Sequence, residues 1–132
     1  MTHHRDQDPL MSALQQTLAE FPLSFAIVFG SQVTGDQLTS SSDVDIAVEF
    51  EAYRLGDEGY NDIYLDLLCT LENAVAVDVD LIDVWTMSLQ FAHVVFTDGE
   101  RLIGTNDRQA YLKQNWLVTH STSKKRVNAW LT

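Results

Sequence analysis

The sequence contains little that would favour a membrane, a disulfide bond or a nucleic acid. It has no apolar run of about 18 residues, so no transmembrane helix is predicted, and residues 1–6 do not begin a signal peptide. Cys69 is the only cysteine, so no internal disulfide can form. Eight basic residues against 19 acidic ones give a net charge of −11, which opposes contact with phosphate backbones. We therefore expect a cytoplasmic protein that binds neither membranes nor nucleic acid directly.

The few basic residues are concentrated near the C-terminus. Residues 108–132 hold five of the eight bases and no acid. Tyr111, Leu112 and Trp116 outline a helix there, and Trp130 adds a second large apolar side chain. This pattern predicts a basic, helical C-terminal segment that contacts something acidic, either the body of its own domain or a partner.

Periodicity predicts one α/β domain over residues 1–132. Leu10, Leu14 and Leu18 mark a first helix, and the i, i+3, i+4 spacing of apolar residues predicts a second over 58–73. Short apolar runs at 23–29 and 43–48, then an acidic run at 75–84, are typical of strands. A third helix, a short strand and C-terminal helices follow. We expect a small mixed β-sheet flanked by helices that lie mainly on one face.

A Gly-Ser turn follows the first predicted strand. Gly30 ends the run of residues 23–29, and Ser31 comes directly after it. Glycine lets backbone N–H groups approach a phosphate without a Cβ in the way, and the Ser31 hydroxyl adds a donor at the same place. The turn is therefore a candidate phosphate-binding site.

Two aspartates open the next predicted strand. Asp43 and Asp45 follow Ser42 and share one strand face, because side chains at i and i+2 of a strand point the same way. Two carboxylates on one face repel each other unless a cation lies between them. Their hard oxygen atoms favour Mg²⁺ or Mn²⁺, completed by substrate phosphates.

A third acidic strand could supply another ligand. Asp78 and Asp80 share a face of the run 75–84, and a carboxylate there would complete a three-carboxylate cluster able to hold two cations. Such a cluster is typical of nucleotidyl transfer. The alternative is a solvated acidic surface, since 13 of the 132 residues are aspartate. The conjunction of strand, Gly-Ser, polar loop and Asp-x-Asp favours the site.

These motifs resemble the DNA polymerase β-like nucleotidyltransferases, and within them the minimal nucleotidyltransferase (MNT) domains. Gly30, Ser31, Asp43 and Asp45 match the Gly-Ser and Asp-x-Asp signature of that family. The stretch from Val79 to Val84 is similar to its third acidic strand. The similarity extends over roughly residues 25–104 and is greatest to the MNT antitoxins of HEPN/MNT toxin–antitoxin pairs.

The resemblance implies a function for each of these residues. Gly30, Ser31 and Ser42 would bind the nucleotide, and Asp43, Asp45 and Asp80 would be catalytic and hold Mg²⁺ or Mn²⁺. The protein would transfer AMP from ATP onto a tyrosine of a HEPN-domain RNase toxin, neutralise it and form a hetero-oligomer with it.

The sequence departs from the family pattern around the Gly-Ser turn. The spacer from Gln32 to Ser42 has eleven residues, one more than is usual, and its first part lacks an arginine that many members carry. Arg54 and Lys113 are the candidates to neutralise the triphosphate instead. Two other functions stay open: a non-catalytic antitoxin that acts by binding alone, and a nucleotidyltransferase acting on a small molecule such as an aminoglycoside.

Overall fold

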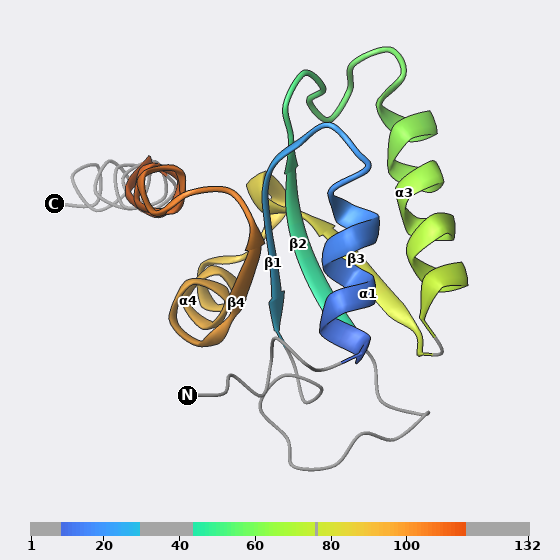
Figure 1. The fold of residues 1–132 in the computed structure, drawn as a ribbon. Coiled ribbons are helices and arrows are strands. Elements are labelled where there is room, and N and C mark those ends of the chain that lie inside the picture. The colour runs from blue at the N-terminus through green and yellow to red at the C-terminus, as the bar shows by residue number, and fades with distance from the viewer. Residues whose placement is uncertain (1–8, 30–43, 76, 116–132) are drawn as a thin grey trace, which may run out of the picture.

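The computed structural model describes residues 9–29, 44–75 and 77–115, and in these ranges it shows a four-stranded sheet with helices on both faces (Figure 1). The strands lie in the order β3-β2-β1-β4. Their bounds are β1 Leu23–Phe29, β2 Val44–Phe50, β3 Val79–Asp83 and β4 Glu100–Ile103. The helices are α1 Pro9–Leu18, α3 Tyr60–Ala74, the 3-10 helix η2 Val84–Thr86, α4 Leu89–Asp98 and a last helix whose described part is 106–115.

The sheet is mixed, as the sequence predicted. β1 runs antiparallel to both β2 and β4, whereas β2 and β3 are parallel. A parallel pair needs a crossover connection, and α3 supplies it between β2 and β3. This crossover brings the starts of β2 and β3 to the same edge of the sheet.

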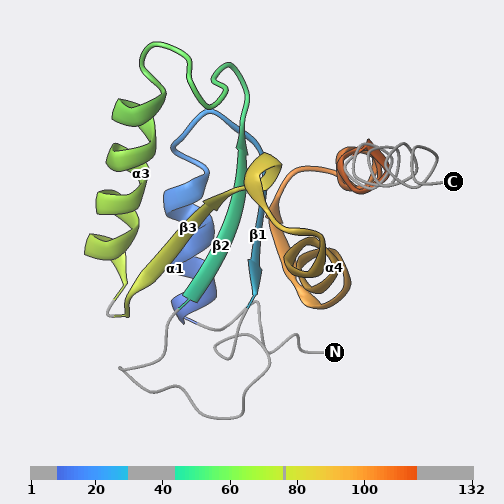
Figure 2. The same cartoon turned by 180° about the vertical axis from the view of Figure 1, so that it is seen from behind.

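Each face of the sheet is covered by its own hydrophobic core. α1 and α3 cover one face, and α4 and helix 106–115 cover the other (Figures 1 and 2). The large side chains that are fully buried in the first core are Leu14, Leu18, Ile46, Phe50, Leu67 and Leu71. The second is built from Phe25, Ile27, Phe29, Ala47, Val84, Met87, Ala92, Val95 and Leu112.

The expectation that helices lie mainly on one face was wrong. β1 reads Leu-Ser-Phe-Ala-Ile-Val-Phe, and six of its seven residues are buried. Side chains alternate between the faces of a strand, so an almost continuously apolar strand needs cover on both. α1 and α3 cover Ala26 and Val28, while α4 and helix 106–115 cover Phe25, Ile27 and Phe29.

The other elements predicted within the described residues are confirmed with shifted ends, and the predicted C-terminal helices are described only over 106–115. Tyr60 and Tyr64 of α3 serve core packing, since Tyr60 is 3% exposed and packs edge-on against Phe50. Cys69 lies on the exposed side of α3. Trp116 and Trp130 lie outside the described residues. Within the described parts, no helix is both long enough and apolar enough to span a membrane.

Candidate functional site

Asp45 and Asp80 lie next to each other at one edge of the sheet. They are paired in register between the parallel strands β2 and β3, and Phe29, the last residue of β1, is paired with Asp45 from the other side. Neighbouring strands are about 4.8 Å apart, so the two carboxylates project from adjacent backbone positions. Two of the predicted ligands are therefore brought together from positions 35 residues apart in sequence.

The two carboxylates face the side of the sheet that carries α4. Their sequence neighbours Val44, Ile46 and Leu81 are buried in the core under α1 and α3. Because side chains alternate along a strand, Asp45 and Asp80 point to the opposite face. Asp45 is half-buried there and Asp80 is exposed. A ligand can therefore reach the pair from the α4 side or from the strand edge.

The other acidic residues of this region have different positions. Asp83 is buried on the α3 side, where its carboxylate accepts hydrogen bonds from the Tyr60 hydroxyl at 2.7 Å and the Trp85 amide at 2.8 Å. Burial and this hydrogen bond raise the pKa of Tyr60, so its hydroxyl stays protonated as a donor. Asp78 precedes β3, is exposed, and its carbonyl accepts a hydrogen bond from the Val44 amide at 2.9 Å. Of these aspartates, Asp80 is the one in register with Asp45.

The remaining predicted site residues lie outside the described parts of the chain. These are Gly30, Ser31, Ser42 and Asp43. The described residues that flank them, Phe29 and Val44, are at the same edge of the sheet as the Asp45–Asp80 pair. Among the described residues, no group of three metal-ligating side chains occurs.

Of the two candidate cations, Arg54 is at the wrong end of the sheet. One of its guanidinium nitrogens donates to the Phe50 carbonyl at 3.2 Å, at the far end of β2 from Asp45. The five residue steps from Asp45 to Phe50 span about 16 Å of strand. The expectation for Arg54 was therefore wrong, because the chain turns back after β2 on the side away from the carboxylates. Lys113 lies on helix 106–115 beside α4, where both line a shallow pocket.

The donor set fits a hard divalent cation. Asp45 and Asp80 offer only carboxylate oxygens, and their adjacent strands hold them together on one face despite their like charge. Oxygen ligands of this kind suit Mg²⁺ or Mn²⁺, which usually bind through one or two carboxylates together with substrate phosphates. Which ion binds stays a prediction.

Sequence reasoning missed one functional group on the same face, the buried carboxylate of Glu49. The signal was present, since Glu49 interrupts the apolar run Ile46-Ala47-Val48 before Phe50. Its partners Trp85 and Arg108 are 36 and 59 residues away in sequence, so no local pattern could identify them.

A mixed sheet with carboxylates at the adjoining starts of two parallel strands is the architecture of a nucleotidyltransferase. The family model "Polymerase beta, Nucleotidyltransferase" matches residues 12–108, and the chain belongs to that family. The match includes β1 to β4 and both described carboxylates. The resemblance noted from the Gly-Ser and Asp-x-Asp motifs is thereby confirmed, and the protein is classed as a nucleotidyltransferase. No curated protein matches the chain.

Several solved structures share the fold. A chain in a crystal structure of a toxin–antitoxin with AMP-PNP is 25% identical, with a TM-score of 0.69 over 91% of this chain and 94% of that one. A chain of the toxin–antitoxin MntA–HepT is 21% identical, with a TM-score of 0.61 over 91% and 95%. A third belongs to a tri-AMPylated Shewanella oneidensis HEPN toxin in complex with MNT antitoxin, at 21% identity and a TM-score of 0.63 over 92% and 95%.

Proposed function

We propose that this protein is an antitoxin that transfers AMP from ATP onto a tyrosine of a HEPN RNase toxin and so neutralises it. The observation that carries the proposal is the in-register pair Asp45–Asp80 in a chain of the nucleotidyltransferase family. Two similar structures support the nucleotide and the partner, one with AMP-PNP and one with an AMPylated HEPN toxin.

The residues of the chain divide the work at the sheet edge. Gly30, Ser31 and Ser42 bind the triphosphate. Asp43, Asp45 and Asp80 hold Mg²⁺ or Mn²⁺, which when bound offsets the negative charge of the phosphates and of the leaving pyrophosphate. Asp80 is the exposed member of the described pair, and this exposure supports a role for it in orienting an incoming hydroxyl group.

The transfer exchanges one phosphorus–oxygen bond for another. The acceptor tyrosine oxygen forms a bond to the α-phosphorus of ATP, and the bond from that phosphorus to the pyrophosphate oxygen breaks. The proton of the tyrosine hydroxyl passes to the solvent as the new bond forms, and pyrophosphate departs. Catalysis of this kind rests mainly on positioning and electrostatic stabilisation, which a fixed pair of strand ends can supply.

The acceptor is a protein in this proposal, so a hetero-oligomer of antitoxin and toxin is expected. The basic C-terminal residues 108–132 suit an acidic surface on that toxin. The cytoplasmic location expected from the sequence stays a prediction.

Co-expression with a HEPN RNase toxin from the same organism tests the proposal. The toxin should gain one or more AMP units on tyrosine, as read by mass spectrometry, and should lose RNase activity. Asp80→Asn should lower transfer by about a thousandfold, because one missing charge-stabilising group costs this much in comparable sites. Asp78→Asn is the matched control, and should leave the modification intact.

The other outcomes identify the competing functions. A toxin that is fully inhibited but carries no added mass would favour an antitoxin acting by binding alone. A chain that copurifies with no toxin, but adenylylates an aminoglycoside, would favour a small-molecule acceptor. Equal loss of transfer in Asp78→Asn and Asp80→Asn would contradict the assignment of Asp80.

A further inference from the structure

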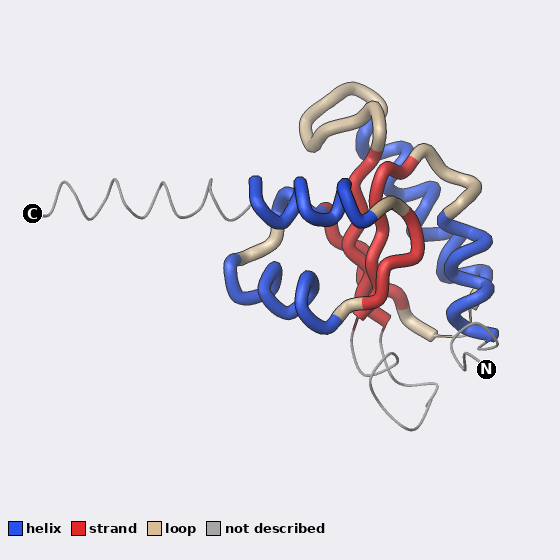
Figure 3. The backbone as a smooth tube through the Cα atoms, turned by 60° about the vertical axis from the view of Figure 1, so that its left-hand side comes forward, coloured by secondary structure: helices blue, strands red, loops and turns tan. Residues whose placement is uncertain are grey.

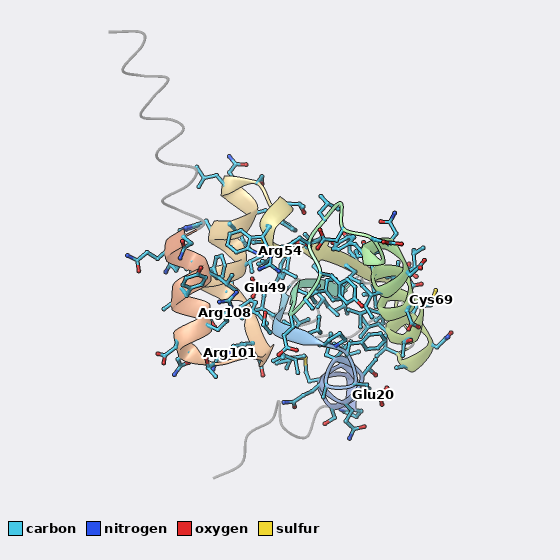
Figure 4. All side chains as sticks on the ribbon, turned by 90° about the horizontal axis from the view of Figure 1, so that it is seen from above. Glu20, Glu49, Arg54, Cys69, Arg101 and Arg108 are labelled. Atoms are coloured by element: carbon cyan, nitrogen blue, oxygen red, sulfur yellow. The ribbon has the colours of Figure 1, made fainter. Side chains whose placement is uncertain are left out.

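Glu49 is a buried carboxylate that the proposed transfer does not use. It lies on β2, four residues beyond Asp45 and on the same face, and is 1% exposed. Arg108 donates to it through two nitrogens at 2.8 and 2.7 Å, and Trp85 through the indole nitrogen at 3.0 Å. The Ser24 hydroxyl is a further donor. These four residues, the Glu49 cluster, join β1, β2, η2 and helix 106–115. Figure 4 shows Glu49 and Arg108 beside each other.

The central pair of the cluster is ionised. Burial favours a higher pKa for Glu49, but the hydrogen bonds from Arg108, Ser24 and Trp85 outweigh burial and hold its pKa below the ordinary value. The pKa of Arg108 is raised, mainly by its hydrogen bond to Glu49. A two-nitrogen contact between guanidinium and carboxylate fixes direction as well as distance. The pair is therefore able to orient the helix that carries Arg108.

Helix 106–115 has few other attachments to the sheet. Leu112 is its one buried side chain in the described part. Gln109 accepts a hydrogen bond from Arg101 of β4 at 2.9 Å, and the Arg108 ring contact with Tyr111 lies within the helix itself. A helix of about ten residues is marginal on its own in water. Its orientation therefore depends strongly on the ion pair with Glu49.

The turn before the helix brings it to the cluster. Gly104 has a φ of +111°, a region that favours glycine, and a Cβ there would lie 2.9 Å from the Ser24 carbonyl oxygen. The chain thus leaves β4 in close contact with β1, beside the Ser24 that donates to Glu49. The backbone turn at Gly104 fixes the start of helix 106–115, and Arg108 fixes the first helical turn.

Helix 106–115 lies on the side of the sheet toward which the Asp45–Asp80 pair points. α1 and α3 cover the opposite face, whereas Asp45 and Asp80 point toward the α4 side. Figure 3 shows helix 106–115 alongside α4 on that side. Lys113 lines a shallow pocket with His93 and Phe96 of α4, and Tyr111 is 50% exposed. After Asp107, this helix enters the segment 108–132, which contains five bases and no acid.

We propose that Glu49 is a positioning residue that, through its ion pair with Arg108, fixes helix 106–115 as part of the docking surface for an acidic face of the acceptor protein. This inference rests on the proposed transfer to a protein tyrosine. Glu49 acts on acceptor binding through the helix, and Asp45, at the other end of β2, acts on the nucleotide.

Hydrogen exchange of the full chain tests the positioning role. Arg108→Met should speed amide exchange in residues 106–115 at least tenfold more than it speeds exchange in α3. Arg101→Met is the matched control, because it removes a similar side chain and the bond to Gln109 but leaves Glu49 paired. Unchanged exchange in 106–115, or equal acceleration of α3 and 106–115, would overturn the role.

Transfer kinetics with the HEPN protein of that co-expression experiment test the docking surface. Arg108→Met should raise the KM for that protein at least fivefold and leave the KM for ATP within twofold, whereas Arg101→Met should change neither. An unchanged KM for the acceptor, in a variant whose helix exchanges faster, would overturn the docking surface. The KM for the acceptor should also rise with salt, since the surfaces carry opposite charge.

Two further results separate failures of different kinds. If Arg108→Met does not fold, Arg108→Lys keeps the charge without the two-nitrogen contact, and the same exchange and KM changes are expected at smaller size. If the wild-type chain modifies no protein, the proposed function and the docking surface both fail. The exchange result would still decide whether Glu49 positions the helix.

Discussion

The two ends of β2 carry acidic side chains on the same face, but with opposite surroundings. Asp45 is in register with a second carboxylate, Asp80, at the edge of the sheet. Glu49, four residues further on, is 1% exposed and held by Arg108 at 2.7 Å. Bringing like charges together is costly unless a ligand offsets the repulsion, whereas a buried ion pair stabilises the surrounding structure only as a complete set. The Asp45 end of β2 is therefore arranged to bind a ligand, and the Glu49 end is arranged to stabilise the fold.

Neutralising Asp45 and Glu49 in separate variants should show the difference between the two ends of β2 most clearly. Glu49→Gln should lower the free energy of unfolding by about 2–4 kcal/mol, because it removes the charged partner of Arg108 from a buried cluster. Asp45→Asn, without metal, should leave that free energy unchanged or raise it by roughly 0.5–2 kcal/mol, because it removes repulsion from Asp80. Denaturant unfolding of both variants beside the wild type measures the difference.

Activity should separate the same two variants in the opposite order. Asp45→Asn should abolish nucleotidyl transfer, whereas the folded fraction of Glu49→Gln should keep transfer at saturating acceptor, with a raised KM for the acceptor. A clear loss of stability in metal-free Asp45→Asn would mean that this aspartate supports the fold, and the contrast between the two ends would disappear.

Low pH should lower the free energy of unfolding through Glu49, by less than the Glu49→Gln substitution does. The pKa of Glu49 in the folded protein lies below its ordinary value of 4.5, so the native state binds this proton less readily than the unfolded chain does. The resulting stability is present above about pH 4.5 and is lost as the pH falls through the lower, folded pKa. Between pH 5 and 3 the wild type should therefore lose more unfolding free energy than Glu49→Gln. Equal slopes for the two proteins would contradict the lowered pKa.

The sequence was informative where the pattern is local. The spacing of Tyr60, Leu67 and Leu71 predicted α3, and the alternation around Asp45 predicted which side chains of β2 share a face. The face covered by α4 was not predicted, although the continuous apolar run of β1 contained the signal. A strand that is buried on both faces shows no alternation of apolar and polar residues, so its sequence does not tell whether helices cover one face of the sheet or both.

Contacts between distant residues could not be predicted from the sequence. Family resemblance assigned Asp80 as the third ligand, and the register with Asp45 agrees with that assignment. Asp83 is another aspartate of the same strand, but its side chain points to the other face of the sheet, where it accepts a hydrogen bond from Tyr60. Strand alternation alone predicts which face of β3 an aspartate side chain points to. Which residue of β2 it lies beside depends on the register of the two strands.

ATP binding with and without divalent metal tests the central claim most directly. Calorimetry of the wild-type chain should show far tighter binding of ATP with Mg²⁺ or Mn²⁺ than without, because the phosphates complete the ligands that the carboxylates begin. Asp45→Asn should lose this metal dependence, and Glu49→Gln should keep it. ATP binding of equal strength with and without divalent metal in the wild-type chain would contradict the assignment of the Asp45–Asp80 end as a metal and nucleotide site.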